Sequence, residues 1–148
     1  MNQSSFNAAH SAWQTLAGFE HLQYSILDID ETNHIIDVLF KFAAQQQIVL
    51  HRHKVLNKTF VIQGEHRLYA ADGRLKEVRT LGTYTSSEPS DTPHREGGGE
   101  LETIVYFSIR GSDGVLYEIL DDNLKIIATL SMQDFKDLYQ KQRQAQSV

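Results

Sequence analysis

The sequence predicts an all-β fold, a sandwich or barrel with a short N-terminal arm and one C-terminal helix. Short apolar runs recur at fairly even spacing, and turn-forming residues separate them. The apolar period changes to helical spacing only after residue 131. The chain has 148 residues, the length of one domain with a sizeable core. We therefore expect one domain over residues 1–148, with the arm at 1–20, the barrel at 21–130, and the helix and tail at 131–148.

The first expected element is the N-terminal arm. Ala8, Ala9 and Ala12 favour one or two helical turns, although only weak capping residues precede them. The large apolar side chains of Trp13 and Phe19 follow, and burying them is favourable. We expect the arm to pack on the body of the protein through these two residues.

The strands come next, and eight to ten of them are expected. The candidate runs cover residues 22–29, 34–42, 47–54, 59–63, 66–70, 74–79, 82–86, 103–110, 115–120 and 124–130. The segment from Asp30 to Asn33 is typical of a hairpin turn. Asp72 followed by Gly73 is a stronger hairpin signal, because this pair tolerates the positive φ angles of two-residue turns.

The last element is a helix that begins near residue 131. Ser131 and Asp134 have the spacing of a capping box, in which the acidic side chain also favours the first helical turn. Apolar residues then recur at helical spacing: Met132, Phe135, Leu138 and Tyr139. We expect the helix to fray in the polar stretch 140–148.

Composition narrows the function. The chain contains no Cys, which excludes disulfides, thiolate metal sites and Cys nucleophiles. Its net charge of −5 provides no basic surface for nucleic acid. It has no apolar run of about 18 residues and no recognisable signal peptide, so we expect no membrane span and a cytoplasmic location. The seven His residues are therefore the most informative part of the composition.

The clearest candidate site is the pair His51 and His53. Residues i and i+2 of a strand point to the same face, so the two imidazoles converge. Two His side chains leave a divalent metal undercoordinated, and His94 is the best third ligand because the turn-rich segment 88–94 can direct it into a barrel mouth. Imidazole suits Zn, Cu, Fe and Ni. The remaining His residues are expected to be surface or structural residues: His10, His21, His34 and His66. Of these, His66 could also face the site.

These residues resemble the two metal motifs of the cupin family. The shared features are His51-x-His53 eleven residues before Gly64, then Gly82-Thr83-Tyr84, Glu88-Pro89 and His94. Within the RmlC-like cupins, the chain resembles the small single-domain group around the acetylacetone-cleaving and 2,4'-dihydroxyacetophenone dioxygenases. The cupin part of zinc-binding anti-sigma factors is a more distant relative. The resemblance spans residues 16–142 and includes the closing strands and helix.

The resemblance implies a cupin β-barrel, that is, a jelly roll or double-stranded β-helix. It also implies a three-His metal site of His51, His53 and His94. Glu88, six residues before His94, keeps the family spacing and is the candidate catalytic residue, either orienting a His or taking a proton from substrate. Many cupins have a Glu four residues after the second His, where this chain has Asn57, which could offer a neutral oxygen.

The function implied is an Fe(II)-dependent dioxygenase that cleaves a C–C bond in a small diketone or hydroxyketone. One alternative is a non-catalytic metal-binding cupin acting as a sensor or small-molecule binding module. Another is a non-redox lyase or isomerase, with Zn or Ni as the metal. The expected partners are a small oxygenated molecule and further copies of the chain, as a dimer or tetramer formed through strands 34–42 and 103–110.

Residues 97–99, all Gly, predict a flexible connection after His94.

Overall fold

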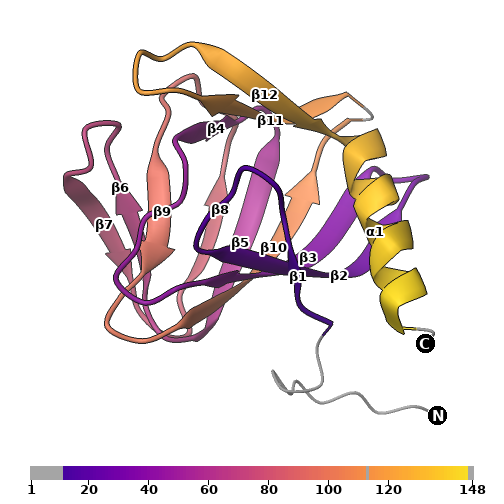
Figure 1. Ribbon diagram of the computed structural model, residues 1–148, viewed down its shortest axis with the longest axis horizontal. Helices are drawn as coiled ribbons and strands as arrows, with labels where there is room; N and C mark the ends of the chain where they lie inside the picture. Colours follow the sequence, from indigo (N-terminus) through magenta and orange to yellow (C-terminus); the bar gives the residue numbers. More distant parts are fainter. Residues whose placement is uncertain (1–11, 113, 147–148) are drawn as a thin grey trace.

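The computed structural model describes residues 12–112 and 114–146, and within them it contains strands and one C-terminal helix (Figure 1). The expected all-β class is confirmed. The elements are β1 (Gln14–Thr15), β2 (Leu22–Asp30), β3 (Ile35–Phe42), β4 (His51–His53), β5 (Leu56–Gln63), β6 (His66–Tyr69), β7 (Leu75–Arg79), β8 (Tyr84–Ser87), β9 (Arg95–Gly98), β10 (Thr103–Arg110), β11 (Val115–Leu120), β12 (Ile126–Ser131) and α1 (Met132–Gln146). No helix in the described part of the chain is long and apolar enough to cross a membrane.

The strands form two walls around a common interior. One wall is a six-stranded sheet with the order β1-β2-β3-β10-β5-β8. The other consists of two three-stranded sheets, β12-β11-β4 and β7-β6-β9. Isolated antiparallel bridges join these two sheets, between His51 and His94 and between Gln47 and Gly97. The second wall is therefore continuous from β12 to β7 through the β4–β9 contact.

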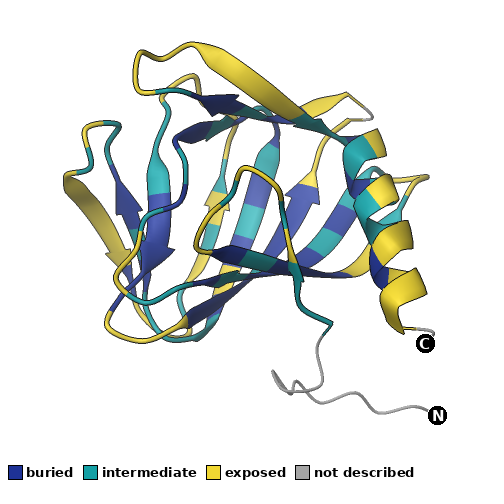
Figure 2. Ribbon diagram, in the orientation of Figure 1, coloured by how far each residue is buried: buried dark blue, intermediate teal, exposed yellow. Residues whose placement is uncertain are grey.

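The core fills the space between the walls, and the burial pattern of the strands shows this (Figure 2). Alternating residues of β3 are buried, as expected for strands with one face on the core. The central strand β10 is buried along nearly its whole length. Fully buried side chains come from both walls, and they include Ile36, Phe42, Ile104, Phe107 and Leu116.

The predicted turns are present. β2 and β3 form an antiparallel hairpin, and the Asp30 carboxylate accepts hydrogen bonds from the backbone and side chain of Asn33. β6 and β7 form a second hairpin, in which Gly73 has a φ of 90°. A positive φ at this position explains why Gly follows Asp72 in the sequence.

Both ends of the described chain pack on the body. In the arm, Phe19 packs against the core, and the Lys41 ammonium lies 4.3 Å from the centre of the Trp13 ring. The predicted docking of the arm is confirmed, but it forms the short strand β1 instead of a helical turn. Ala8 and Ala9 lie outside the described residues.

The capping box of α1 is confirmed. The Ser131 backbone N–H donates to the Asp134 carboxylate at 2.7 Å, and the Asp134 N–H donates to the Ser131 hydroxyl at 3.2 Å. The helix continues to Gln146 instead of fraying after residue 140. It continues because Gln142, in the polar stretch, has a buried partner on β2.

Three local predictions are wrong. The strand expected at 47–54 is only three residues long, β4. Residues 97–99 do not form a flexible connection: Gly97 and Gly98 belong to β9, and a Cβ on Gly97 would lie 1.8 Å from the Gln46 carbonyl oxygen. Strands β3 and β10 cannot pair with a second subunit, because each already has a neighbour on both edges.

We expect Gln142→Ala to destabilise the fold. The Gln142 amide donates to the Ile26 carbonyl and accepts from the Ile26 N–H, both at 2.8 Å, so it pairs with β2 as an edge strand would. Gln142 is only 2% exposed, and its loss would leave two backbone groups without partners at a cost of about 2–4 kcal/mol. Urea unfolding measures this cost, with the exposed Gln140→Ala as the matched control. Equal stabilities of the two variants would contradict the prediction.

Candidate metal centre

The first part of the site is the His51-x-His53 pair on β4. Both side chains are buried on the inner face while Arg52 is only partly buried, as the strand period requires. Strand β11 fixes their position, since His51 pairs with Ile119 and His53 pairs with Tyr117. The two imidazole rings stack with centroids 5.6 Å apart, so the predicted convergence is confirmed.

The second part comes from β9 and the residue before it. His94 exchanges two backbone hydrogen bonds with His51, at 2.9 and 3.0 Å, which fixes the two strands side by side. Glu96 lies two residues further along and therefore points to the same face as His94. The structure thus brings the three predicted His residues together and adds a carboxylate that the sequence analysis missed.

The four side chains form a compact set of donor atoms. Glu96 Oε2 lies 2.6 Å from His51 Nε2, 3.2 Å from His94 Nε2 and 3.8 Å from His53 Nε2. All four ligand atoms lie within 4.8 Å of one another. Donors about 2.0–2.2 Å from one ion have spacings of this size, so the set could hold a divalent metal.

The hydrogen bonds require a cation between His51 and Glu96. His51 Nδ1 lies 2.8 Å from the Val49 carbonyl oxygen, which can only accept, so Nδ1 carries the hydrogen. In a neutral ring the other nitrogen, Nε2, then has a lone pair that faces the Glu96 carboxylate at 2.6 Å. Two acceptors at this distance need a proton or a metal ion between them. His53 Nε2 is also buried without a hydrogen-bond partner.

Burial and the Glu96 carboxylate shift the pKa values of the His side chains in opposite directions. Burial lowers the pKa of His53 to about 4 and also lowers the pKa of His94. Burial acts in the same direction on His51, but the hydrogen bond and charge of Glu96 outweigh it and raise the pKa. Burial would raise the pKa of Glu96, but hydrogen bonds from the surrounding His residues hold it well below its usual value. His53 and His94 are thus neutral at pH 7, the form that binds metals.

His66 is a fourth imidazole at the site. It is fully buried on β6, and its Nε2 lies 2.7 Å from the second carboxylate oxygen of Glu96, Oε1. Its ring stacks on Phe42 with centroids 5.3 Å apart. The His66 contact fixes Glu96 so that Oε2 faces the other three imidazoles, which is the arrangement of a metal ligand held by an outer partner.

The other predicted residues lie apart from this cluster. Glu88 is exposed and forms no hydrogen bond with a described His residue, although it lines the cavity beside the cluster. Asn57 is fully buried, but its amide is occupied: it accepts from the Tyr117 hydroxyl and donates to the Val55 carbonyl. Asn57 therefore does not offer an oxygen to the cluster. His21 is exposed, His34 is partly buried, and His10 lies outside the described residues.

Glu96 was not predicted, and His66 was expected to be a surface or structural residue that could face the site, for identifiable reasons. Because the three glycines at 97–99 predict a flexible connection after His94, the i+2 relation of Glu96 to His94 was not apparent. The same strand rule that paired His51 with His53 would have found it. For His66 the sequence carries no comparable signal, since its contact with Glu96 depends on the pairing of β6 with β9.

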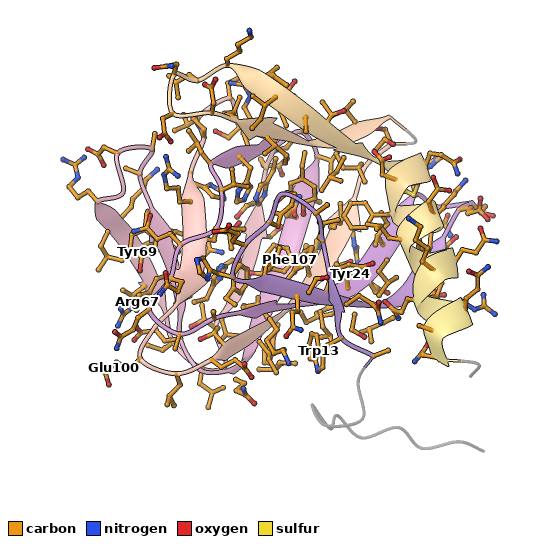
Figure 3. The ribbon with its side chains drawn as sticks, in the orientation of Figure 1. Trp13, Tyr24, Arg67, Tyr69, Glu100 and Phe107 are labelled. Carbon is orange, nitrogen blue, oxygen red and sulfur yellow. The ribbon has the colours of Figure 1, made fainter. Side chains whose placement is uncertain are left out.

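Two cavities adjoin the cluster. A cavity of about 170 Å³ is reached by His53, His94 and Glu96, and most of its other lining residues are polar or charged. On the other side lies an apolar cavity of about 30 Å³, which His51 and Glu96 also reach. Phe107, which is labelled in the interior in Figure 3, lines both. Only the larger cavity has room for a small ligand next to the cluster.

Comparisons with known proteins identify the fold. No protein-family model and no curated protein matches the chain. An RmlC-like cupin protein from Ralstonia eutropha JMP134 is 19% identical with a TM-score of 0.74, over 98% of this chain and 89% of that chain. An acetylacetone dioxygenase from Acinetobacter johnsonii is 13% identical with a TM-score of 0.68, over 96% of this chain and 94% of that chain.

A third similar structure is the complex of SigE with the anti-sigma protein ChrR from Rhodobacter sphaeroides. The identity is 20% and the TM-score 0.55, over 69% of this chain and 50% of that chain. The chain therefore has the cupin fold, and its structural neighbours include both groups that its motifs resemble. At these identities the likeness concerns the fold.

We expect Glu96→Gln to weaken metal binding more than Glu88→Gln. Glu96 supplies a charged oxygen within the cluster, whereas Glu88 lies outside it. Loss of a direct ligand should exceed the roughly 10- to 100-fold cost of losing an outer partner. His51→Ala, His53→Ala and His94→Ala should have comparably large effects. Chelator competition with Zn(II) or Co(II) measures the affinities, and the reverse order for the two Glu variants would contradict this ligand set.

We expect His66→Phe to weaken metal binding by about 10- to 100-fold, because Glu96 then loses its outer hydrogen bond. Phe keeps the ring that stacks on Phe42. His66→Asn retains a donor and should recover part of the affinity. The same competition assay, together with the visible spectrum of the Co(II)-loaded protein, distinguishes altered ligation from general loosening. Wild-type affinity in His66→Phe would show that Glu96 needs no outer partner.

Proposed function

We propose that the protein is a metal-dependent enzyme of dioxygenase type that acts on a small diketone or hydroxyketone. The observation that carries the proposal is the buried cluster of His51, His53, His94 and Glu96 beside a cavity large enough for a small molecule. Its donors are all nitrogen and oxygen, as they must be in a chain without Cys. Such a set suits divalent Fe, Zn, Ni or Mn.

The metal would be held by the Nε2 atoms of the three His residues and by Glu96 Oε2. When bound, a divalent ion polarises the oxygen atoms of a chelating substrate, and iron in addition supports reactions with O₂. Three neutral imidazoles and one carboxylate reduce the charge of the centre from +2 to +1. The remaining charge favours a substrate that binds as an enolate or another anion.

The chain's own residues have three tasks in this proposal. His66 holds Glu96, and Tyr117 packs over His53 with ring centroids 5.1 Å apart. Phe107 and the apolar cavity exclude water from the other side of the cluster. Glu88, on the rim of the larger cavity, takes a proton from the substrate as it becomes an enolate.

The alternative of a non-redox lyase or isomerase is favoured by one observation, the carboxylate in the cluster. A fourth protein ligand leaves fewer positions for substrate and O₂ together than three His residues would. The non-catalytic sensor or binding module receives its support from the similarity to the complex that contains ChrR. In either case Zn or Ni would replace Fe.

Oxygen uptake by the Fe(II)-loaded protein tests the proposal. We expect uptake with at least one member of a panel of small diketones and hydroxyketones, and equal amounts of cleaved product. Glu96→Gln with restored iron content should lose most of the activity, while Glu88→Gln should lower the rate with little change in iron content. Turnover that continues without O₂ would favour the lyase or isomerase. Full iron occupancy with no turnover of any panel member would contradict enzymatic action on this class.

A further inference from the structure

The larger cavity contains a basic group that the proposed reaction does not use. We propose that this cavity selects a diketone or hydroxyketone that also bears a carboxylate, and that Arg79 and Lys76 bind that carboxylate beside the metal centre. The inference rests on the proposed function and narrows its substrate class. It depends on the hydrogen-bond donors of the cavity wall, which the strands β5, β7 and β8 provide.

Arg79 is the central residue of this wall. It is 9% exposed, lies at the end of β7 and lines the same cavity as His53, His94 and Glu96. A buried guanidinium is costly unless acceptors surround it. Its Nε donates to the Glu77 carboxylate at 2.6 Å, and its Nη1 faces two threonine hydroxyls. Among the described residues no acceptor is recorded for Nη2, so the guanidinium retains donor capacity.

The hydroxyls of Thr59 and Thr85 also provide one hydrogen-bond donor that has no partner among the described residues. Thr59 Oγ1 and Thr85 Oγ1 are hydrogen-bonded to each other at 2.5 Å, and both accept from Arg79 Nη1, at 3.5 and 3.2 Å. One hydroxyl proton is used in the mutual bond. The other proton has no acceptor among the described residues. Arg79 and Thr59 line the cavity and, with Thr85 beside them, form a group of donors. A carboxylate is the ligand that consists of acceptors alone.

Lys76 adds a second positive charge to the cavity. It lines the cavity from β7 and forms no salt bridge with a described residue. Two acidic residues of the same cavity are already engaged: Glu77 pairs with Arg79, and the His residues enclose Glu96. Glu88 is exposed at the rim. An anionic ligand would therefore find one free cation and a guanidinium with spare donors.

The size and polarity of the space agree with a small polar ligand. The cavity volume of about 170 Å³ is sufficient for a ligand of a few carbon atoms, and serine, threonine and asparagine side chains line it. The apolar cavity on the other side, of about 30 Å³, is too small for one. A substrate that reaches the cluster must therefore enter through the larger, polar cavity. There an uncharged diketone would leave the donors of Arg79 unpaired.

A matched pair of ligands tests this inference. Acetoacetate and pentane-2,4-dione differ only by a carboxylate in place of an acetyl group. We expect calorimetry on the Zn(II)-loaded protein, with zinc content measured first, to give at least about tenfold tighter binding of acetoacetate. Arg79→Gln should remove this preference and leave the binding of pentane-2,4-dione and zinc unchanged. Arg74→Gln, an exposed arginine outside this cavity, is the control and should behave as wild type.

Lys76→Gln keeps the test decisive if Arg79→Gln fails to fold, because Lys76 is exposed. This variant should bind acetoacetate about two- to fivefold more weakly, and its affinity should depend less on ionic strength. Equal binding of the two ligands by wild type, or a preference for acetoacetate that is undiminished in both variants, would overturn the inference. Two measurements separate the two proposals. Failure of the protein to bind zinc would contradict the metal centre. The same ligand titrations on metal-free protein measure the Arg79-dependent preference for acetoacetate independently of the metal.

Discussion

A carboxylate lies almost completely out of solvent at the centre of this molecule, and much of the interior is arranged to make that burial tolerable. The Glu96 side chain is only 4% exposed. An isolated buried carboxylate would cost several kcal/mol or take up a proton. Here His51 and His94 approach one oxygen and His66 approaches the other, so the charge is compensated from β4, from β6 and from the residue before β9. Two of these imidazoles, those of His51 and His94, could also share a metal with the carboxylate.

The backbone bridge between His51 and His94 links this cluster to the architecture. It joins the two three-stranded sheets into one wall, and at the same point it brings two metal-ligating side chains together. The bridge extends to Gly97, where only glycine fits against the Gln46 carbonyl. A side chain there would push β9 away from the loop before β4 and would displace Glu96, the adjacent residue. The absence of a side chain at Gly97 is therefore also a condition for the position of Glu96 in the cluster.

The sequence predicts much of this structure wherever the information is local. Strand alternation gave most of the strands, Asp72 and Gly73 gave a hairpin, and the Ser131–Asp134 capping box gave the start of α1. Strand period also gave the convergence of His51 and His53. What the sequence could not reveal depends on contacts between distant strands. Glu96, on β9, supplies a carboxylate to the cluster, whereas Asn57, on β5, does not, and this difference is visible only once both strands surround one interior.

The position of the carboxylate on β9 has a consequence for the cavity. Because Asn57 is neutral and bound to Tyr117 and Val55, the β5 side of the cavity carries no negative charge near the cluster. Arg79 and the Thr59 hydroxyl can then face the larger cavity without an acidic neighbour on β5 that would accept their hydrogen bonds. The carboxylate reaches the cluster from β9 instead, where His66 fixes it from behind. In a cupin fold built in this way, β9 supplies the charge that the metal requires, while the end of β7 and the neighbouring β5 remain free to recognise the charge of the substrate.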